Sequence, residues 1–559
     1  MNDFVRGLLR AVQHLPLRSR LARFYRSLED PRAEQAGRLR DILAANAGTV
    51  YGREFGFAHI RNADEYRRAV PVRPYRAFAP YIDRMRNSES NVLVAQPLEM
   101  FAMSSGTEAE PKYIPVTRRF TVEHHYMHLM WLWQMMAARP LRIVGPVLTL
   151  ISPAESERTP GGIPCGASSG KQYRDQSIPM RRLHPVPYEV FLIPDCLRKY
   201  YAMLLFALPH DIRSANSVNP SSLTLLADIL NAHAEALLDD LYYGTLNAFP
   251  GFTPEEKTRL GLKLRPAPGR ARALREIYRA NGKLLPRDVW PNIAAINTWQ
   301  GGCAPFYLPQ VRAEWGDAAQ RCWGLRATEG IFSVPHADSS PSGTVAVGAH
   351  FLEFADATEN EELFGEFPET LLAHELTPGR RYRLICTTSG GLYRYDMGDI
   401  VECTGFTART PDIAFLHKAG GVVSITGEKV SASHAVAAGG AVARAAAPLS
   451  GFTVGLETAG TPRYVVYAEP EAGAVGNPED LPRMAEALDA ELSRVNIEYR
   501  DKRASGRLGA PAAYWLPSGS YRKYRAYLVN HGRPDGQVKP PQLLKPEALA
   551  DFLRIVNGD

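Results

Sequence analysis

The chain lacks the features that mark several large classes of protein. Its six cysteines are scattered without a Cys-x-x-Cys pair: Cys165, Cys196, Cys303, Cys322, Cys386 and Cys403. That spacing argues against a zinc site and against the disulfide framework of a secreted protein. No apolar run approaches the length of a membrane span, and no signal-peptide pattern opens the chain. No dense Lys/Arg run is interleaved with aromatic residues, so nucleic acid is not an expected partner. We therefore expect a cytoplasmic protein with no membrane association.

The composition that remains is that of an ordinary globular protein. Hydrophobic residues make up 45% of the chain and charged residues 22%. A chain of 559 residues exceeds what one core usually serves, so two or more domains are expected. The net charge of +6 permits an anionic ligand such as a nucleotide. Nothing in the sequence indicates an oligomeric state.

A loop rich in hydroxyl groups joins two predicted strands, residues 98–103 and 113–116. It begins with Ser104, Ser105, Gly106 and Thr107. Backbone N–H groups and hydroxyls around a glycine can form a concavity that binds phosphate oxygens, and Lys112 adds a positive charge at the end of the loop. This is not the ordinary P-loop, because Pro111 precedes the lysine and a strand follows it. For this stretch alone, a polar surface hairpin is the alternative.

The second of these strands leads into a helix that Thr117 is predicted to cap, ending at residue 138. His124 and His128 lie one turn apart in it, a spacing found in zinc sites of the His-Glu-x-x-His type, but the glutamate is missing. Because the helix is dense in Met and Trp, we interpret both as packing histidines. Beyond it, residues 159–171 are rich in Gly and Pro and are predicted as a long loop.

Two acidic residues stand at predicted turns further along the chain. Thr328 and Glu329 follow a strand, and a carboxylate beside a phosphate-binding loop is a suitable ligand for Mg²⁺. Asp399 follows a glycine after Tyr393 to Asp396, and a carboxylate presented there can accept hydrogen bonds from a sugar diol. Either stretch could be a plain turn; in the second case Arg394 and Asp396 would be solvated surface charges.

The composition changes after residue 418. Ala419-Gly420-Gly421 is followed by an Ala-rich helix, a strand at 464–468 and a helix at 478–495. We therefore expect an N-terminal domain of residues 1–418 and a C-terminal domain of residues 419–559, with a hinge at the glycines. The C-terminal domain carries Lys429 and Lys539.

Together these motifs resemble the adenylate-forming superfamily and, more closely, the Gretchen Hagen family of acyl-acid amido synthetases, in a bacterial-type member. The resemblance runs nearly end to end, through Thr49-Val50-Tyr51-Gly52, Val70-Pro71-Val72-x-x-Tyr75, Ser104-Ser105-Gly106-Thr107, Ala327-Thr328-Glu329-Gly330, Leu392-Tyr393-Arg394-Tyr395-x-x-Gly398-Asp399, Ser424-Ile425-x-Gly427-Glu428-Lys429 and Gly536-Gln537-x-Lys539.

The resemblance implies an α/β fold, with a large N-terminal adenylate-forming domain and a smaller, mobile α+β C-terminal domain, and ATP with Mg²⁺ as cofactors. It implies that ATP and a small-molecule carboxylic acid give an acyl-adenylate and pyrophosphate, and that an amine or amino acid then gives an amide and AMP. An acyl-CoA or carrier-thioester ligase and a degenerate nucleotide-binding scaffold are the alternatives.

The resemblance also implies a role for each motif residue. The phosphates would contact Ser104, Ser105, Gly106, Thr107 and, at the α-phosphate, Thr328. Glu329 would hold Mg²⁺, Asp399 would hold the ribose with Tyr395 nearby, and Lys418 would contact the nucleotide. Lys429 and Lys539 would neutralise the phosphate or adenylate, with Lys539 favoured; solvated surface amines are the alternative.

Departures from the family pattern bear on efficiency more than on reaction class. Glu108 and Glu110 place carboxylates beside the expected phosphates. Leu325 stands where the family often has an aromatic residue to stack on adenine. His417 and Lys418 stand where plant members have arginines, and a lysine keeps the charge without the bidentate fork.

Overall fold

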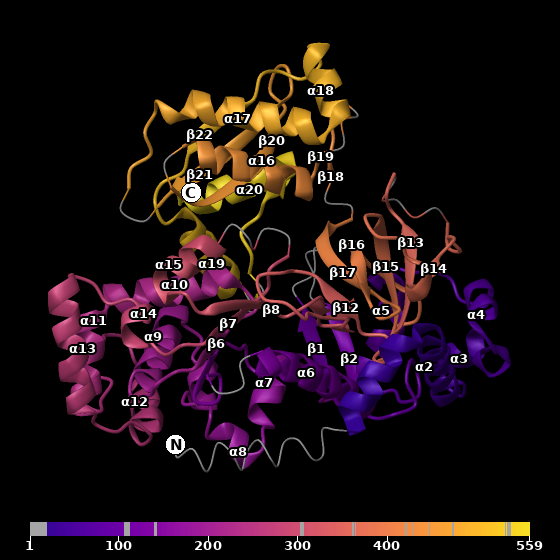
Figure 1. The fold of residues 1–559 in the computed structure, drawn as a ribbon, viewed down its shortest axis with the longest axis horizontal. Coiled ribbons are helices and arrows are strands. Elements are labelled where there is room, and N and C mark those ends of the chain that lie inside the picture. Colours follow the sequence, from indigo (N-terminus) through magenta and orange to yellow (C-terminus); the bar gives the residue numbers. More distant parts are fainter. Residues whose placement is uncertain are drawn as a thin grey trace. The chain divides into compact units, whose positions relative to one another are not determined.

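The structure is a computed structural model that describes residues 19–104, 112–138, 142–301, 304, 307–359, 361, 363, 365–419, 422–426, 428, 430–446, 448–471, 474–531, 533 and 538–558. The chain forms two compact units, one of residues 1–300, 307–397 and 401–415, and the other of residues 301–306, 398–400 and 416–559 (Figure 1). The domain division predicted between residues 418 and 419 stays a prediction.

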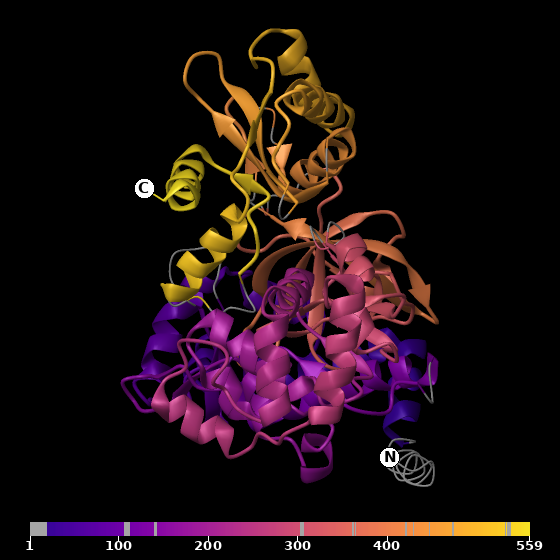
Figure 2. The ribbon, with the colours of Figure 1, turned by 90° about the vertical axis from the view of Figure 1, so that its left-hand side faces the viewer.

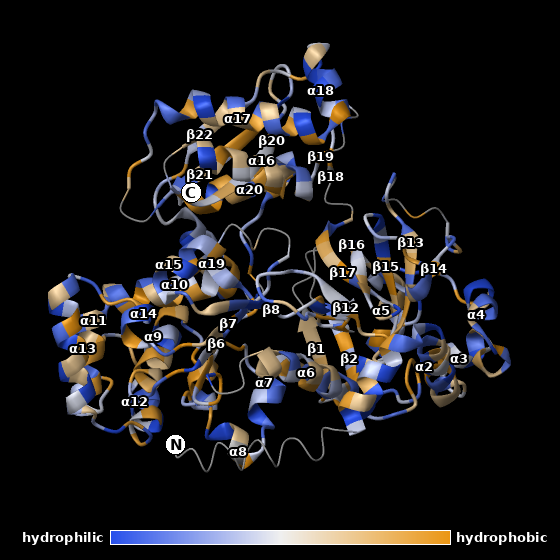
Figure 3. Cartoon of the chain, in the orientation of Figure 1, coloured by the Kyte–Doolittle hydropathy of each residue, from blue (hydrophilic) through white to orange (hydrophobic). Residues whose placement is uncertain are grey.

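A four-stranded sheet of the first unit carries the start of the hydroxyl-rich loop. Its order is β2 (Lys112–Thr117), β1 (Leu98–Ser104), β5 (Pro164–Gly166) and β4 (Glu157–Arg158). The antiparallel β1–β2 pairing places Ser104 opposite Lys112, which confirms the two predicted strands. Figure 3 colours β2 as hydrophobic, in keeping with its buried Ile114 and Val116.

The predicted helix after β2 is α6 (Arg118–Ala138), and Thr117 Oγ1 accepts the backbone N–H of Phe120 at 3.2 Å as its cap. The prediction of a long loop at residues 159–171 is partly wrong. Strand β5 lies within it, and α7 (Ser168–Arg174) begins there, because Gly166 and Gly170 pack directly against the backbone of residues 152–155. A side chain at either glycine would collide with that backbone.

A parallel sheet forms the second layer of the first unit. Its order is β3 (Val147–Thr149), β6 (Ser214–Asn216), β7 (Ala295–Thr298) and β8 (Ala319–Cys322). The helices that follow β3, β6 and β7 along the chain are α8 (Ile178–Arg181), α9 (Cys196–Ala207), α10 (Pro220–Ala232), α11 (Ala234–Tyr243), α12 (Pro254–Gly261), α13 (Pro268–Asn281), α14 (Pro286–Val289) and α15 (Leu308–Trp315). Their buried Leu, Phe and Trp side chains form a core with the sheet.

The third sheet of the first unit has seven strands of different lengths. Its order is β11 (Ser333–Val334), β12 (Gly343–Val345), β17 (Thr410–Lys418), β16 (Tyr395–Thr407), β15 (Arg381–Thr387), β13 (Phe351–Asp356) and β14 (Leu371–Leu372). A separate short hairpin, β9 (Arg326–Ala327) with β10 (Gly330–Ile331), precedes it in the chain. Asp399 therefore lies inside strand β16, not on the predicted turn, although Gly398 before it has φ +69°.

N-terminal helices pack on this sheet and are joined to it by buried polar contacts. They are α2 (Pro31–Asn46), α3 (Val50–Glu54), α4 (Ala63–Ala69) and α5 (Tyr75–Arg86). The buried amide of Gln35 donates to the carbonyls of Val347 (2.5 Å) and His350 (2.6 Å) and accepts from the N–H of Leu352 (2.8 Å). This one side chain thus supplies hydrogen bonds that the backbone of a neighbouring strand would otherwise supply at the start of β13.

The second unit is built on a sheet of order β22 (Ala512–Trp515), β21 (Arg463–Pro470), β20 (Leu449–Glu457) and β23 (Leu543–Leu544). Helices α16 (Ala432–Ala445) and α17 (Asp480–Val495) cover one face, and α20 (Pro546–Asn557) lies on the other (Figure 2). Also in this unit are β18 (Val422–Val423), β19 (Val430–Ser431), α18 (Ile497–Ala504) and α19 (Ser520–Asn530). The predicted strand at 464–468 and the helix at 478–495 are confirmed.

Among the described helices, none is both long and apolar enough to cross a bilayer.

Candidate functional site

Three separate motifs meet through their side chains in the first unit. The Lys112 ammonium donates to the hydroxyl of Tyr395 at 3.4 Å, and that hydroxyl donates to Glu329 Oε1 at 3.2 Å. Lys112 ends the hydroxyl-rich loop, Glu329 lies in the turn between β9 and β10, and Tyr395 opens β16. Tyr395 and Glu329 are buried, so a cation, a phenol and a carboxylate form a chain largely protected from bulk water.

Tyr75 fixes the position of this chain from the side of β2. Its hydroxyl accepts the N–H of Tyr113 at 2.7 Å, and the Lys112 ammonium lies 5.4 Å from the centre of its ring. Burial raises the pKa of Tyr75 to about 12, so the phenol stays neutral at physiological pH. The sequence shows Tyr75 only as part of a motif. No sequence pattern predicts its hydrogen bond with the backbone of Tyr113.

The Glu329 turn is a tight two-residue hairpin, with Gly330 paired to Ala327. A Cβ on Gly330 would lie 2.2 Å from Nε2 of His350, so only glycine fits beside that ring. Burial lowers the pKa of His350 to about 3, and the ring therefore packs as a neutral group.

The histidines of α6 pack in the same region. Burial lowers the pKa of His124 to about 3, and His128 stacks against Trp131 with ring centres 5.6 Å apart. Their interpretation as packing histidines agrees with these contacts. The described residues contain no group of three or more His, Cys, Asp or Glu side chains placed to hold a metal ion.

The alternative for Arg394 and Asp396, solvated surface charges, is wrong. Arg394 is fully buried; its Nε donates to Glu353 Oε2 at 3.0 Å. Its Nη1 donates to the carbonyls of Arg67 (2.9 Å) and Val70 (2.8 Å). Asp396 accepts two hydrogen bonds from Arg383. These charges hold β16 against β13, β15 and the segment after α4.

In the stretches of β16 and β17 that belong to the second unit, residues 398–400 and 416–418, Asp399 forms an ion pair with Lys418. The carboxylate is buried, whereas the lysine side chain is 45% exposed. The ammonium of Lys418 is therefore a partner that solvent or a ligand can reach, and Asp399 is the buried end of the pair.

The structure describes some of the remaining predicted site residues and leaves others outside the described ranges. Ser104 ends β1, Thr328 lies in the β9–β10 turn, and Lys539 is exposed after the buried Val538. Outside the described residues lie Ser105, Gly106, Thr107, Glu108, Glu110 and Lys429. Glu428, beside Lys429, accepts from the N–H groups of residues 425 and 426 and from Tyr464, so it stabilises its own turn.

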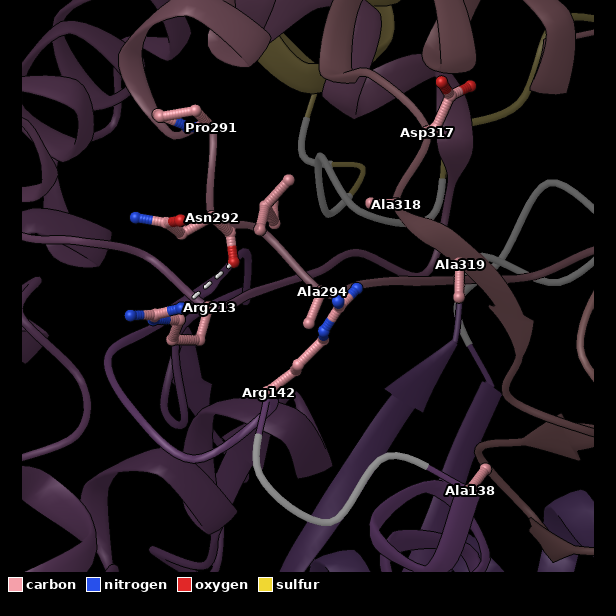
Figure 4. Close-up of a pocket in the computed structure, with 10 residues that line it drawn as sticks. Ala138, Arg142, Arg213, Pro291, Asn292, Ala294, Asp317, Ala318 and Ala319 are labelled. Atoms are coloured by element: carbon pink, nitrogen blue, oxygen red, sulfur yellow. Dashed lines mark hydrogen bonds between the residues drawn. The ribbon is translucent and has the colours of Figure 1, made fainter. Parts of the chain in front are cut away.

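A cavity of about 820 Å³ in the first unit lies apart from these motifs. It is lined by Ala138, Arg142, Arg213, Pro291, Asn292, Ile293, Ala294, Asp317, Ala318 and Ala319 (Figure 4). Arg213 is paired with Asp211 at 2.7 Å and donates to the carbonyl of Asn292 at 3.5 Å. The cavity adjoins the amino ends of β6, β7 and β8, opposite to the carboxyl ends at which open parallel sheets bind ligands. We do not assign it to the candidate site.

Comparison with known families gives three matches in sequence order. The GH3 family N-terminal domain matches residues 20–319, the GH3 family central domain matches 343–418, and the GH3 family C-terminal domain matches 431–548. The curated relatives include indole-3-acetic acid-amido synthetase GH3.8 of Oryza sativa subsp. indica, 26% identical over 93% of this chain and 90% of its own length. Another is indole-3-acetic acid-amido synthetase GH3.3 of Arabidopsis thaliana, 24% identical over 93% of this chain and 91% of its own.

Among solved structures, GH3.15 acyl acid amido synthetase has a TM-score of 0.82 at 20% identity, covering 95% of this chain and 94% of its own. A 2-hydroxyisobutyryl-CoA ligase has a TM-score of 0.55 at 12% identity, covering 96% and 94%. The predicted fold class, α/β with a large N-terminal and a smaller C-terminal domain like adenylate-forming enzymes, is confirmed. The two curated relatives named above are plant proteins, so they give no support to the bacterial-type part of the prediction.

Proposed function

This chain belongs to the GH3 family, and on that premise we infer that it is an ATP-dependent acyl-acid amido synthetase. It adenylates a carboxylic acid with release of pyrophosphate, then transfers the acyl group to an amine or amino acid with release of AMP. The observation that carries this inference is the chain of contacts from Lys112 through Tyr395 to Glu329, which brings three separate motifs to one place.

The chemistry requires such a place. A carboxylate is a poor electrophile because its leaving group would be oxide, whereas an acyl-adenylate releases AMP. The enzyme must therefore hold a triphosphate and stabilise the charge that develops on it. We propose that Ser104, Ser105, Gly106 and Thr107 bind the phosphates, that Thr328 contacts the α-phosphate, and that Lys112 supplies positive charge.

Mg²⁺ fits the carboxylate at the turn. This ion usually keeps several waters and is bound by one or two carboxylates together with substrate phosphates. Glu329 supplies one buried carboxylate, and Tyr395 holds one of its oxygens by a hydrogen bond, leaving the other to coordinate. When bound, the ion would neutralise phosphate charge. Glu329 is the residue that would hold it.

The nucleotide's sugar is assigned to Asp399. We propose that the ribose hydroxyls replace the ammonium of Lys418 as partners of this buried carboxylate, and that Lys418 then contacts the phosphates. Lys539, exposed in the second unit, is the favoured lysine to neutralise the phosphate or adenylate, ahead of Lys429. The division into residues 1–418 and 419–559, a hinge at residues 419–421 and a cytoplasmic location complete the proposal.

The test is ATP–pyrophosphate exchange over a panel of aryl, indolyl and fatty acids. We expect exchange with at least one acid, reduced about 100-fold or more in Glu329→Ala and in Asp399→Ala. The matched control is Glu498→Ala, an exposed carboxylate of α18, which should exchange like the wild type. Wild-type exchange in both site variants would remove the site assignment.

Product analysis then identifies the acceptor. The enzyme, ATP and the active acid are incubated with amino acids or with coenzyme A. An amide product supports the proposal, whereas a thioester alone would assign the chain to the ligase alternative, and absence of exchange with every acid would favour the nucleotide-binding scaffold.

A further inference from the structure

A partly buried arginine with no carboxylate partner among the described residues opens the hairpin that carries Glu329. Arg326 opens β9, and its guanidinium carbon lies 5.5 Å from the ring centre of Trp131 and 5.1 Å from that of Trp323. The two indoles stack on each other at 4.2 Å. Each is fixed in place, because its N–H donates to a backbone carbonyl, of Cys322 for Trp131 and of Ser217 for Trp323.

The guanidinium makes few hydrogen bonds. Its Nε donates to the carbonyl of Trp323 at 2.8 Å, and Nη1 lies 3.2 Å from Nδ1 of His128. Nη2 is buried and has no partner, and no ion pair joins Arg326 to any described carboxylate. Burial and the nearby guanidinium hold the pKa of His128 well below its usual range, so His128 accepts as a neutral ring. Burial lowers the pKa of Arg326 to about 9, which leaves it charged at neutral pH.

The fully buried arginines of the first unit, in contrast, are paired. Arg394 pairs with Glu353, Arg321 with Asp338 and Arg38 with Glu123. Taking a charge out of water without a counter-charge is unfavourable, and an arginine of this kind is expected where an anion arrives from outside the chain. The Nη2 of Arg394 is also unpartnered, so the missing counter-charge is what sets Arg326 apart, and its Nη2 is the donor that an anion would meet.

The free donors of Arg326 suit one kind of anion. Because Nε and Nη1 each have a partner, Nη2 is the free corner of the guanidinium, and it shares one edge with Nη1. That edge presents parallel donors that match the two oxygens of a carboxylate. The indoles against the guanidinium face exclude water and strengthen the contact.

We propose that Arg326 binds the carboxylate of the acid substrate and positions it beside the Thr328–Glu329 turn for attack on the α-phosphate. The inference rests on the proposed function and goes further, since it names the group that recognises the acid. His128 orients the guanidinium, and the stacked pair Trp131–Trp323 supports it.

The experiment measures exchange kinetics in wild type, Arg326→Gln and Arg326→Lys, with the acid that gives the highest wild-type activity. In Arg326→Gln we expect the KM for the acid to rise about 10- to 100-fold while the KM for ATP changes about twofold or less. Arg326→Lys should fall in between, because it keeps the charge and loses the fork. The matched control is Arg119→Gln, a partly exposed arginine of α6 paired with Glu123, and its KM for the acid should stay at the wild-type value.

Direct binding provides a readout that does not depend on turnover. Calorimetry of the acid with the full chain, without ATP, should show binding to wild type. In Arg326→Gln the affinity for the acid should fall by a factor that matches the rise in its KM. Added guanidinium ion, below the concentration that unfolds the protein, should restore part of the exchange to Arg326→Ala.

The outcomes separate the two hypotheses. An unchanged KM for the acid in folded Arg326→Gln overturns this inference and leaves the proposed function standing. An equal rise in the KM for ATP assigns the arginine to a phosphate and also overturns it. Should Arg326→Gln fail to fold, the KM of Arg326→Lys decides. Exchange by the wild type with no acid of the panel would refute the proposed function itself, and the inference with it.

Discussion

Arg394 is fully buried in the first unit and Arg326 is partly buried there with a buried Nη2, and the structure treats the two charges in opposite ways. Arg394 has Glu353 at 3.0 Å and two backbone carbonyls as acceptors, and Glu353 in turn accepts from Thr370 at 2.8 Å. Arg326 has one carbonyl, one neutral imidazole and two aromatic faces. A charge that has its counter-charge within the fold stabilises it, whereas a charge without one is available to a ligand.

The residues of the motif at 392–399 also differ from one another in role. Tyr393 stacks on Tyr51 at 4.9 Å, and its hydroxyl donates to the carbonyl of Leu93. Arg394 adopts φ +44°, which directs the strand that follows. Only Tyr395 contacts Lys112 and Glu329. Tyr393 and Arg394 are therefore architecture that places Tyr395, whereas Asp399 at the end of the motif is the residue proposed for the ribose.

The largest expected effect tests the paired arginine. Arg394→Gln removes the nearer counter-charge of the buried Glu353 carboxylate and leaves Arg67 at 3.4 Å, so the free energy of unfolding should fall by about 3 kcal/mol. Urea denaturation, followed by a probe in the first unit, measures the change. The double variant Arg394→Met with Glu353→Met removes both charges and should recover much of the loss. A single variant within about 1 kcal/mol of wild type would break the comparison.

The next effect concerns two neutral histidines of the first unit, His124 and His350. The pKa values of His124 and His350 are about 3 in the folded protein, against about 6.5 when unfolded. The unfolded chain therefore binds more protons below pH 6.5, and stability is lost as pH falls through that range. Each histidine should contribute about 2 kcal/mol of loss between pH 6.5 and 4.5.

The measurement is the pH dependence of urea unfolding. His350→Phe should show a shallower decline than wild type, and His531→Gln, which changes an exposed ring, should show the same decline as wild type. Equal slopes in all three proteins would mean that His350 is protonated in the folded state.

A smaller effect tests the functional member of the motif. Tyr395→Phe removes the hydroxyl between Lys112 and Glu329, which should slow ATP–pyrophosphate exchange about 5- to 10-fold, the equivalent of one hydrogen bond. The matched variant is Tyr66→Phe, because that hydroxyl bonds Thr387 at 2.9 Å inside the core. Tyr66→Phe should lower stability and leave exchange per folded molecule unchanged; equal loss of exchange in both would contradict the assignment.

The smallest expected effect returns to Arg326. In Arg326→Gln no carboxylate is left unpaired, so the free energy of unfolding should stay within about 1 kcal/mol of wild type. The same urea measurement, on the same day as Arg394→Gln, gives the sharpest form of the contrast. A loss of several kcal/mol would make Arg326 a structural residue.

The local parts of the fold could be predicted from the sequence. The short apolar runs in residues 98–103 and 113–116, and the Thr117 cap, predicted β1, β2 and α6 because these signals lie within a few residues. Strand β5 could not be found in the same way. Its apolar run is short, and it exists because β1, more than sixty residues earlier, pairs with it.

The candidate site, too, could be predicted only where its signals are local in the sequence. Residue type and turn position were enough to single out Glu329, Tyr395 and Asp399. Sequence spacing carried no sign that Asp399 lies within a strand or that Arg394 meets a glutamate 41 residues away. Arg326 had no sequence signal because an arginine beside a turn is ordinarily a surface residue, and its contacts with two indoles appear only in the structure.

The amide of Gln35 has a consequence for how this protein is made. Its partner Leu352 lies 317 residues further along the chain. At a translation rate of about 5–20 residues per second, helix α2 leaves the ribosome roughly 15–60 s before the strand it completes. During that interval the helix exposes its apolar face, so the nascent chain is a natural client for chaperones, and slow codons after residue 46 would lengthen its exposure.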